Sequence, residues 1–138
     1  MYDKPFQLDI VAPDRVVFRG SVSSVTVPGA LGSFQVLYDH APLLAELTPG
    51  PLAIRSLSGE NSYYAVGGGF AEVRANHVVI LADSAERADE IDVERAEDAK
   101  DIAENKLHAR APGENLGEAQ AAFQRAVTRL KVARKRTE

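Results

Sequence analysis

Two arginines near the C-terminal end of the chain, Arg125 and Arg129, lie four positions apart in an expected helix. Residues four apart on a helix share one face, and guanidinium groups supply planar, charge-assisted hydrogen-bond donors to phosphate. A nearby carboxylate and backbone groups could hold the rest of a phosphate-bearing ligand. A simpler interpretation stays open, in which both arginines only solvate a helix face. Another is that they pair with Asp89, Glu90 and Asp92.

Other reactive side chains do not form a catalytic or metal-binding pattern. His40 and His77 fall in expected loops and His108 near a helix end, so the sequence predicts neither a metal site nor a catalytic triad. The chain contains no cysteine, which excludes disulfides, thiolate catalysis and zinc–thiolate sites. A small enzyme is therefore the least supported class of function, because only scattered carboxylates favour it.

The three glycines Gly67 to Gly69 resemble a phosphate loop only superficially. Phosphate loops connect a strand to a helix, whereas these glycines lead into Phe70 and an expected strand. We therefore expect a bulge or a close backbone contact there. The basic tail from Lys131 to Arg136 has no interleaved aromatic residues. Because the chain is also acidic overall, with a net charge of −4, nucleic-acid binding is not expected.

Length and composition are typical of a globular protein. The 138 residues are 45% apolar and 26% charged, enough for one domain or a small domain with an appendage. There is no run of about 18 apolar residues, so we expect no membrane span. The N-terminus lacks the basic start and apolar core of a signal peptide. These features favour a cytoplasmic protein.

The first module, residues 1–87, alternates like short strands and is interrupted by glycine and proline. We expect a β-hairpin of Phe70–Ala75 and Val78–Ala82 around an Asn76-His77 turn, with the second strand covered on both faces. Pro49-Gly50-Pro51 is expected to be another turn. About eight to ten strands at this spacing predict an all-β sandwich or barrel. Its core candidates in one strand are Leu43, Leu44 and Leu47.

The second module, residues 88–138, has helical spacing and separated charges. Asp89 or Asp92 can cap a first helix, and Pro112-Gly113 ends it. A second helix follows from Leu116, so the two form an antiparallel hairpin. The apolar face of the first helix consists mostly of alanine. Because alanine buries little surface, we expect a marginally stable hairpin that leans on the sandwich or on a partner.

The order of these modules, and three segments within them, resemble the epsilon subunit of bacterial F-type ATP synthases, which is called delta in mitochondria. The segments are PGALGSFQVLYDHAPLL, VGGGFAEVRANHVVILAD and AERADEIDVERA, in collinear order over nearly the whole chain. The resemblance implies a non-catalytic rotor subunit of a proton-translocating enzyme. It would couple rotation of the ring of c subunits to ATP synthesis in the catalytic head.

The resemblance also implies partners and a location. The sandwich would bind the gamma subunit and the c-subunit ring, and the helices would reach the alpha/beta catalytic head when extended. In that position they would inhibit ATP hydrolysis. The chain would then lie on the cytoplasmic face of the bacterial inner membrane, held there only through the complex. The runner-up interpretation is a free-standing ATP-sensing module.

Some bacterial members of this family bind ATP through an Ile-Asp-x-x-Arg-Ala motif and arginines on the second helix. This chain matches the motif from Ile91 to Ala96, with Glu86 upstream. It departs from the strongest binders at Ile102, where they carry arginine. ATP would be a regulator and not a required cofactor. The ATP-binding residues implied are Glu86, Ile91, Asp92, Arg95, Ala96, Arg125 and Arg129.

The rotor contact is expected in two loops at one end of the sandwich, 29–33 and 38–42. Loop residues with amphipathic side chains suit protein interfaces. The interface residues predicted are Gly32, Tyr38, Asp39, His40 and Pro42.

Overall fold

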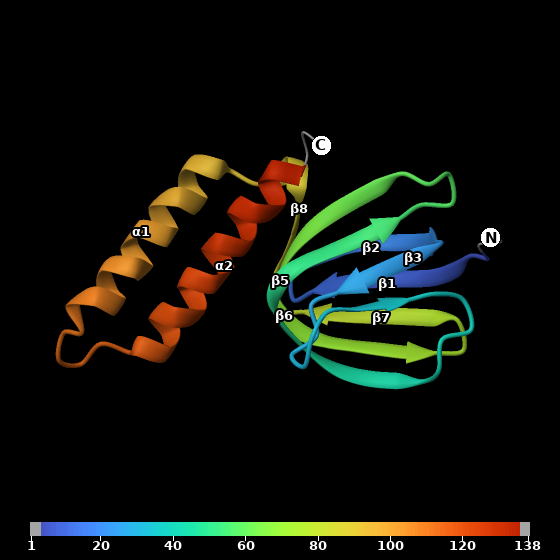
Figure 1. The fold of residues 1–138 in the computed structure, drawn as a ribbon, viewed down its shortest axis with the longest axis horizontal. Coiled ribbons are helices and arrows are strands. Elements are labelled where there is room, and N and C mark those ends of the chain that lie inside the picture. Colours follow the sequence, from blue (N-terminus) through green and yellow to red (C-terminus); the bar gives the residue numbers. More distant parts are fainter. Residues whose placement is uncertain (1–3, 136–138) are drawn as a thin grey trace.

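The computed structural model describes residues 4–135 and consists of an N-terminal β-sandwich followed by two helices (Figure 1). The sequence prediction of this fold is confirmed. The described part contains eight strands, a short 3-10 helix and two α-helices. In chain order these are β1 Phe6–Ala12, β2 Arg15–Val22, β3 Ser24–Val27, β4 Phe34–Val36, β5 Leu43–Arg55, β6 Asn61–Arg74, β7 His77–Ala82, β8 Ala85–Arg87, η1 Ala88–Glu90, α1 Val93–Ala109 and α2 Leu116–Lys135.

Strands β5 and β6 are long, and both layers of the sandwich share them. The first half of β5 and the second half of β6 join β7, β1 and β2 in one layer. The second half of β5 and the first half of β6 join β3, β4 and β8 in the other. Figure 1 shows both strands bending sharply on the side that faces the helices. The interior is filled by inward-facing aliphatic side chains such as Leu8, Ile10, Leu52 and Ile80, all fully buried.

The Pro49-Gly50-Pro51 segment is not a turn, so that prediction was wrong. It lies inside β5 and pairs with Gly67 to Ala65 of β6. The chain bends there without reversing, and a bend uses the same residue types as a turn. Gly69 makes the bend possible, because its φ is 132° and a Cβ would lie 2.0 Å from the carbonyl oxygen of Leu81. This close approach is the role that the sequence predicted for the three glycines.

The hairpin of β6 and β7 differs from its prediction in two details. The turn consists of Ala75 and Asn76, one residue earlier than expected, and both have positive φ. Only one face of β7 is covered, because Leu81 is 55% exposed while Val78, Ile80 and Ala82 are buried. The unbroken apolar sequence of β7 therefore places apolar side chains on the outside of the sandwich.

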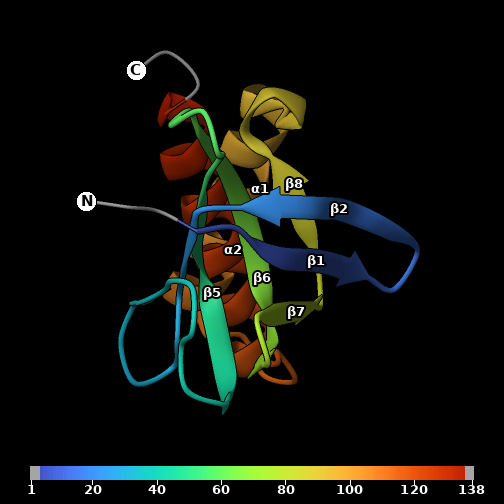
Figure 2. The same cartoon turned by 90° about the vertical axis from the view of Figure 1, so that its right-hand side faces the viewer.

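The helical hairpin packs against the bend of β5 and β6. Its α2 helix lies next to the sandwich and α1 lies on the far side of α2 (Figures 1 and 2). The contact with the sandwich is a small cluster in which Val132 and Ala133 meet Ala65, Ala88 and Ile91. Within residues 4–135, neither helix is long and apolar enough to cross a membrane.

Candidate functional site

A cavity of about 220 Å³ lies where β8, the start of α1 and the middle of α2 meet. Five of the seven residues predicted to bind ATP line this cavity, although they come from three separate elements. Glu90, which the sequence analysis did not select, completes the lining. The lining residues are Glu86, Glu90, Asp92, Arg95, Ala96 and Arg129.

Hydrogen bonds and ion pairs hold the charged side chains of this cavity in place. Arg129 Nε donates to Glu86 Oε1, which ties α2 to β8. Asp92 Oδ1 accepts from the backbone N–H of Arg95 at 3.1 Å, so Asp92 caps α1 as predicted. Glu86 thus lies in β8, Asp92 at the start of α1 and Arg129 within α2, so regular elements hold these charged side chains in place.

Glu90 links the cavity to the far edge of the sandwich. Its Oε1 accepts from the backbone N–H of Arg87 at 3.2 Å, and its Oε2 accepts from Arg15 Nη1 at 3.3 Å. Arg15 also donates to the carbonyl oxygen of Ala85 at 3.2 Å. Arg15 is 75 positions before Glu90 in the chain. No local sequence pattern signals so distant a pair, which is why the Arg15–Glu90 contact was not predicted.

The two remaining predicted ATP-binding residues lie outside the cavity. Ile91 is buried in the cluster that joins the hairpin to the sandwich. Arg125 pairs with Glu118 of its own helix at 3.3 Å, and its side chain passes close to Gly67. The alternative partners expected for the arginines were wrong, because Arg125 and Arg129 pair with Glu118 and Glu86.

Ile102, the departure from the family pattern, does not face this cavity. It is exposed in a separate groove between the two helices, which Ala99, Lys106 and Ala122 also line. In the arrangement seen here, its effect on a ligand in the cavity is therefore indirect.

The cavity lining suits a polar ligand with both hydrogen-bond donors and anionic groups. Three carboxylates can accept from hydroxyl or amino groups, and two guanidinium groups can donate to phosphate. Arg129 already has a carboxylate partner, so a phosphate would have to compete with Glu86. The volume is below the ~300 Å³ of a typical small-molecule pocket, so the cavity would enclose only part of a nucleotide.

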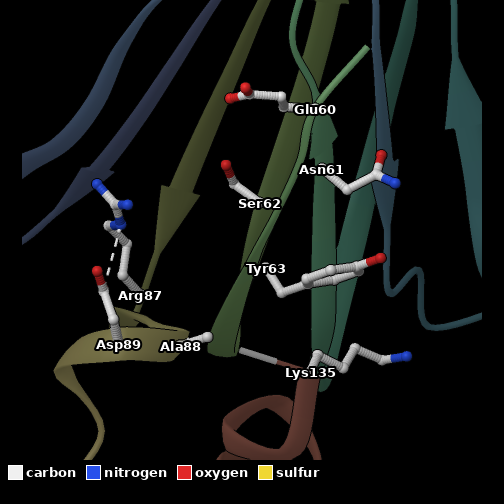
Figure 3. Close-up of a pocket in the computed structure, with 8 residues that line it drawn as sticks. All are labelled: Glu60, Asn61, Ser62, Tyr63, Arg87, Ala88, Asp89 and Lys135. Atoms are coloured by element: carbon white, nitrogen blue, oxygen red, sulfur yellow. Dashed lines mark ion pairs between the residues drawn. The ribbon is translucent and has the colours of Figure 1, made fainter. Parts of the chain in front are cut away.

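A second, more open hollow of about 630 Å³ lies between the β6 end of the sandwich and the end of α2 (Figure 3). Lys135 Nζ lies 5.1 Å from the centre of the Tyr63 ring, a cation–π distance. On the other side of the hollow Arg87 pairs with Asp89 at 3.3 Å (Figure 3). The Tyr63–Lys135 contact therefore adds a polar attachment of α2 to the sandwich.

The outer face of the β7-containing layer carries an apolar row. The strand registers align Phe70 with Leu81, Leu81 with Val11, and Val11 with Val16, across four neighbouring strands. Phe70, Leu81 and Val16 are 49–55% exposed. Leu44 lies on the same face at 70% exposure, so it is not a core residue as predicted, and Leu43 is also exposed. Leu47 is buried as expected.

The loops predicted to contact the rotor lie on either side of β4, one before it and one after it, and they contact different parts of the sandwich. Gly32 lies before β4 in a segment that hydrogen-bonds along β5, with Ala30 N–H donating to Glu46. Tyr38, Asp39, His40 and Pro42 lie after β4, beside the turn between β6 and β7. The structure therefore separates the five predicted interface residues into two groups.

Comparisons with known proteins agree over nearly the whole chain. The sequence profile of the ATP synthase delta/epsilon chain β-sandwich domain matches residues 5–88. The profile of the ATP synthase delta/epsilon chain long α-helix domain matches residues 89–134.

Individual relatives carry the same family description. The ATP synthase epsilon chain of Moorella thermoacetica is 45% identical over 126 residues, which cover 91% of this chain and 94% of the relative. That of Herpetosiphon aurantiacus is 46% identical over 132 residues and 96% of both chains. A chain in the cryo-EM structure of the Euglena gracilis mitochondrial ATP synthase, OSCP/F1/c-ring in rotational state 1, superposes with a TM-score of 0.76 and 26% identity. That superposition covers 87% of this chain and 76% of the other. On this evidence the chain belongs to the ATP synthase delta/epsilon chain family.

Proposed function

We propose that this chain is a non-catalytic central-stalk subunit of a proton-translocating rotary ATP synthase, which couples rotation of the c-subunit ring to ATP synthesis. The observation that carries the proposal is the exposed apolar row on the sandwich, formed by Phe70, Leu81, Val11 and Val16. Aromatic and aliphatic side chains gathered on an exposed face mark a protein-binding surface. The gamma subunit is the partner we assign to this face.

The remaining partners and the location follow from the same role. The loops on either side of β4 would contact the c-subunit ring or gamma, and the helices would reach the alpha/beta head when released. The chain would lie on the cytoplasmic side of a bacterial inner membrane and be held there through these subunits.

The thin attachment of the helical hairpin supports a regulatory role. The apolar contact with the sandwich involves mainly alanines, Ile91 and Val132. The polar attachments include the Glu86–Arg129 ion pair and the Tyr63–Lys135 contact. Because these side chains are mostly small, they bury less apolar surface than leucine side chains would, which lowers the free-energy cost of releasing the hairpin. A released hairpin could extend toward the catalytic head and inhibit ATP hydrolysis.

ATP is the ligand that we propose for the cavity beside α1. Its phosphates would displace Glu86 from Arg129, while Asp92 and the released Glu86 would accept from the base or ribose. Bound ATP would bridge α1, α2 and β8 and so favour the docked hairpin. Binding only to the docked state stabilises that state by about 2.7 kcal/mol at a ligand concentration of 100 Kd.

The rotor role is tested with membranes whose ATP synthase lacks this subunit. Adding the unaltered chain should restore proton-driven ATP synthesis, and Leu81→Asp should not, because a carboxylate in the apolar row must be desolvated at the interface. The matched control is Leu57→Asp, since Leu57 is 58% exposed in the turn between β5 and β6, away from this row. If the two variants restored synthesis equally, the row would not be the stalk contact.

The inhibitory role has its own test. Assembled enzyme that carries a chain truncated after Asp89 should hydrolyse ATP faster than enzyme with the full chain. Unchanged hydrolysis would remove inhibition from the proposed function while leaving the rotor role intact.

A free-standing ATP-sensing module is the second candidate, and only the cavity favours it. The two candidates differ in partner binding. A sensor would bind ATP tightly as a purified chain and show no affinity for gamma, whereas the stalk subunit must bind gamma with or without ATP.

A further inference from the structure

Two loops that are distant in sequence are joined by a reciprocal pair of hydrogen bonds. The backbone N–H of Asp39 donates to Asn76 Oδ1 at 2.7 Å, and Asn76 Nδ2 donates to Asp39 Oδ1 at 3.0 Å. Asp39 lies in the loop between β4 and β5, and Asn76 lies in the turn between β6 and β7. We call this pair the 39–76 clasp.

Both residues of the clasp have a backbone conformation that residues other than glycine rarely adopt. The φ angles are 64° at Asp39 and 62° at Asn76, and neighbouring Ala75 has a φ of 48°. The left-handed region costs an L-residue about 1–2 kcal/mol, and Asn and Asp tolerate it when they hydrogen-bond locally. Here the compensating bonds run between the two loops. Strained residues that the surroundings hold in place cluster at binding sites.

The loop that the clasp holds presents apolar side chains to solvent. Leu37 is 50% exposed and Tyr38 is 38% exposed, and Lys4 Nζ lies 5.3 Å from the centre of the Tyr38 ring. The loop then runs through Pro42 into β5, where exposed Leu44 lies on the face of the apolar row. The loop is therefore continuous in the chain with the strand at the edge of that surface.

We propose that Asn76 is a positioning residue for the stalk interface: it fixes the 37–40 loop so that Leu37 and Tyr38 form a preorganised extension of the surface that binds gamma. This inference rests on the proposed function. Asn76 need not touch the partner itself, because a loop already held in its bound conformation loses less conformational entropy on binding. The occupant is a protein surface and not an anionic lipid, since Asp39 directly follows Leu37 and Tyr38 in the loop and its negative charge would repel anionic headgroups.

The test compares three full-length variants with the unaltered chain for binding to an alpha/beta/gamma complex that lacks this subunit. Asn76→Gly keeps the positive φ available but removes both hydrogen bonds. Asn76→Asp keeps the acceptor for the backbone N–H but sets two carboxylates against each other. Combining Asn76→Asp with Asp39→Asn exchanges the side chains and restores both bonds. The readouts are the dissociation constant and the melting temperature of each chain.

We expect Asn76→Gly to weaken binding about five- to tenfold, the loss expected when a few side chains must be ordered on association. We expect Asn76→Asp to weaken it similarly and the exchanged pair to bind within about twofold of the unaltered chain. Equal binding by Asn76→Gly and the unaltered chain would refute the inference, and so would failure of the exchange to rescue Asn76→Asp. Absence of binding by the unaltered chain would instead refute the proposed function, and the inference with it.

If all the variants have the same melting temperature, the loss of binding comes from the position of the loop and not from a less stable fold. If Asn76→Gly lost binding only in proportion to a large fall in melting temperature, the clasp would be a stability element and the inference would be wrong.

Discussion

Truncating Val132 to alanine should release the helical hairpin while leaving the sandwich intact. Val132 is fully buried in the cluster that joins α2 to Ala65, Ala88 and Ile91. The change removes two methyl groups, worth about 0.8 kcal/mol each, and leaves a small cavity. The expected loss is about 2 kcal/mol of docking free energy, so the ratio of docked to released hairpin falls about thirtyfold.

Native-state amide hydrogen exchange measures this loss directly. Amides of α2 that exchange through release of the hairpin should exchange about thirtyfold faster in Val132→Ala. Core amides of β1 and β7 should keep their rates. The matched control is Val25→Ala, because Val25 is also fully buried but lies in the sandwich core. This control should accelerate the core amides and leave hairpin release unchanged.

The reasoning would be refuted if the two variants accelerated the same amides by the same factor. Sandwich and hairpin would then unfold as one cooperative unit, and a hairpin that leaves the sandwich on its own would not exist in this protein. Selective acceleration in α2 would instead give the free energy of docking as a measured quantity.

Three further outcomes are expected. Arg129→Ala should reduce the rise in melting temperature that millimolar ATP produces, because it removes a hydrogen-bond donor to phosphate. Arg74→Ala, which changes an exposed arginine away from the cavity, should leave that rise unchanged. An equal ATP response in both variants would argue against ATP binding in the cavity. Ala75→Gly should raise the free energy of unfolding in urea by up to about 1 kcal/mol, since glycine adopts the φ of 48° without strain; a lower value would show that the turn is not strained. Burial raises the pKa of Asp9, but hydrogen bonds from Gln7 and His77 and the charge of Arg19 more than offset this effect, so the pKa lies below the ordinary 3.8. Asp9 therefore contributes stability above pH 3.8 that is lost as the pH falls through its folded pKa, and Asp9→Asn should show a smaller fall in urea stability between pH 7 and pH 3.

Local patterns were enough to predict the fold because each element carries its own signal. Alternation in β1, the cap at Asp92 and the break at Pro112-Gly113 depend only on neighbouring residues. The bend at Pro49 was misread because turns and bends use the same residues, and the difference depends on the strand opposite. The outward position of Leu81 likewise depends on whether another layer covers the sheet, which the sequence of β7 alone does not specify.

The candidate sites were predictable only where a helix or a contiguous motif supplied the residues. Asp92, Arg95 and Ala96 come from one motif, and the cavity contains all three. Glu90 pairs with Arg15, and Asn76 pairs with Asp39, although the partners are far apart in the sequence. Such pairs depend on strand order and register, so they become visible only when the sandwich is assembled.

The two strands shared by both layers have a mechanical consequence. A sandwich whose layers touch only through side chains can shear, because sliding one layer over the other breaks weak contacts alone. In this protein β5 and β6 continue from the apolar outer face, around the bend, to the layer beside the hairpin. A twisting load applied to the outer face would therefore pass through covalent backbone to the layer beside the hairpin.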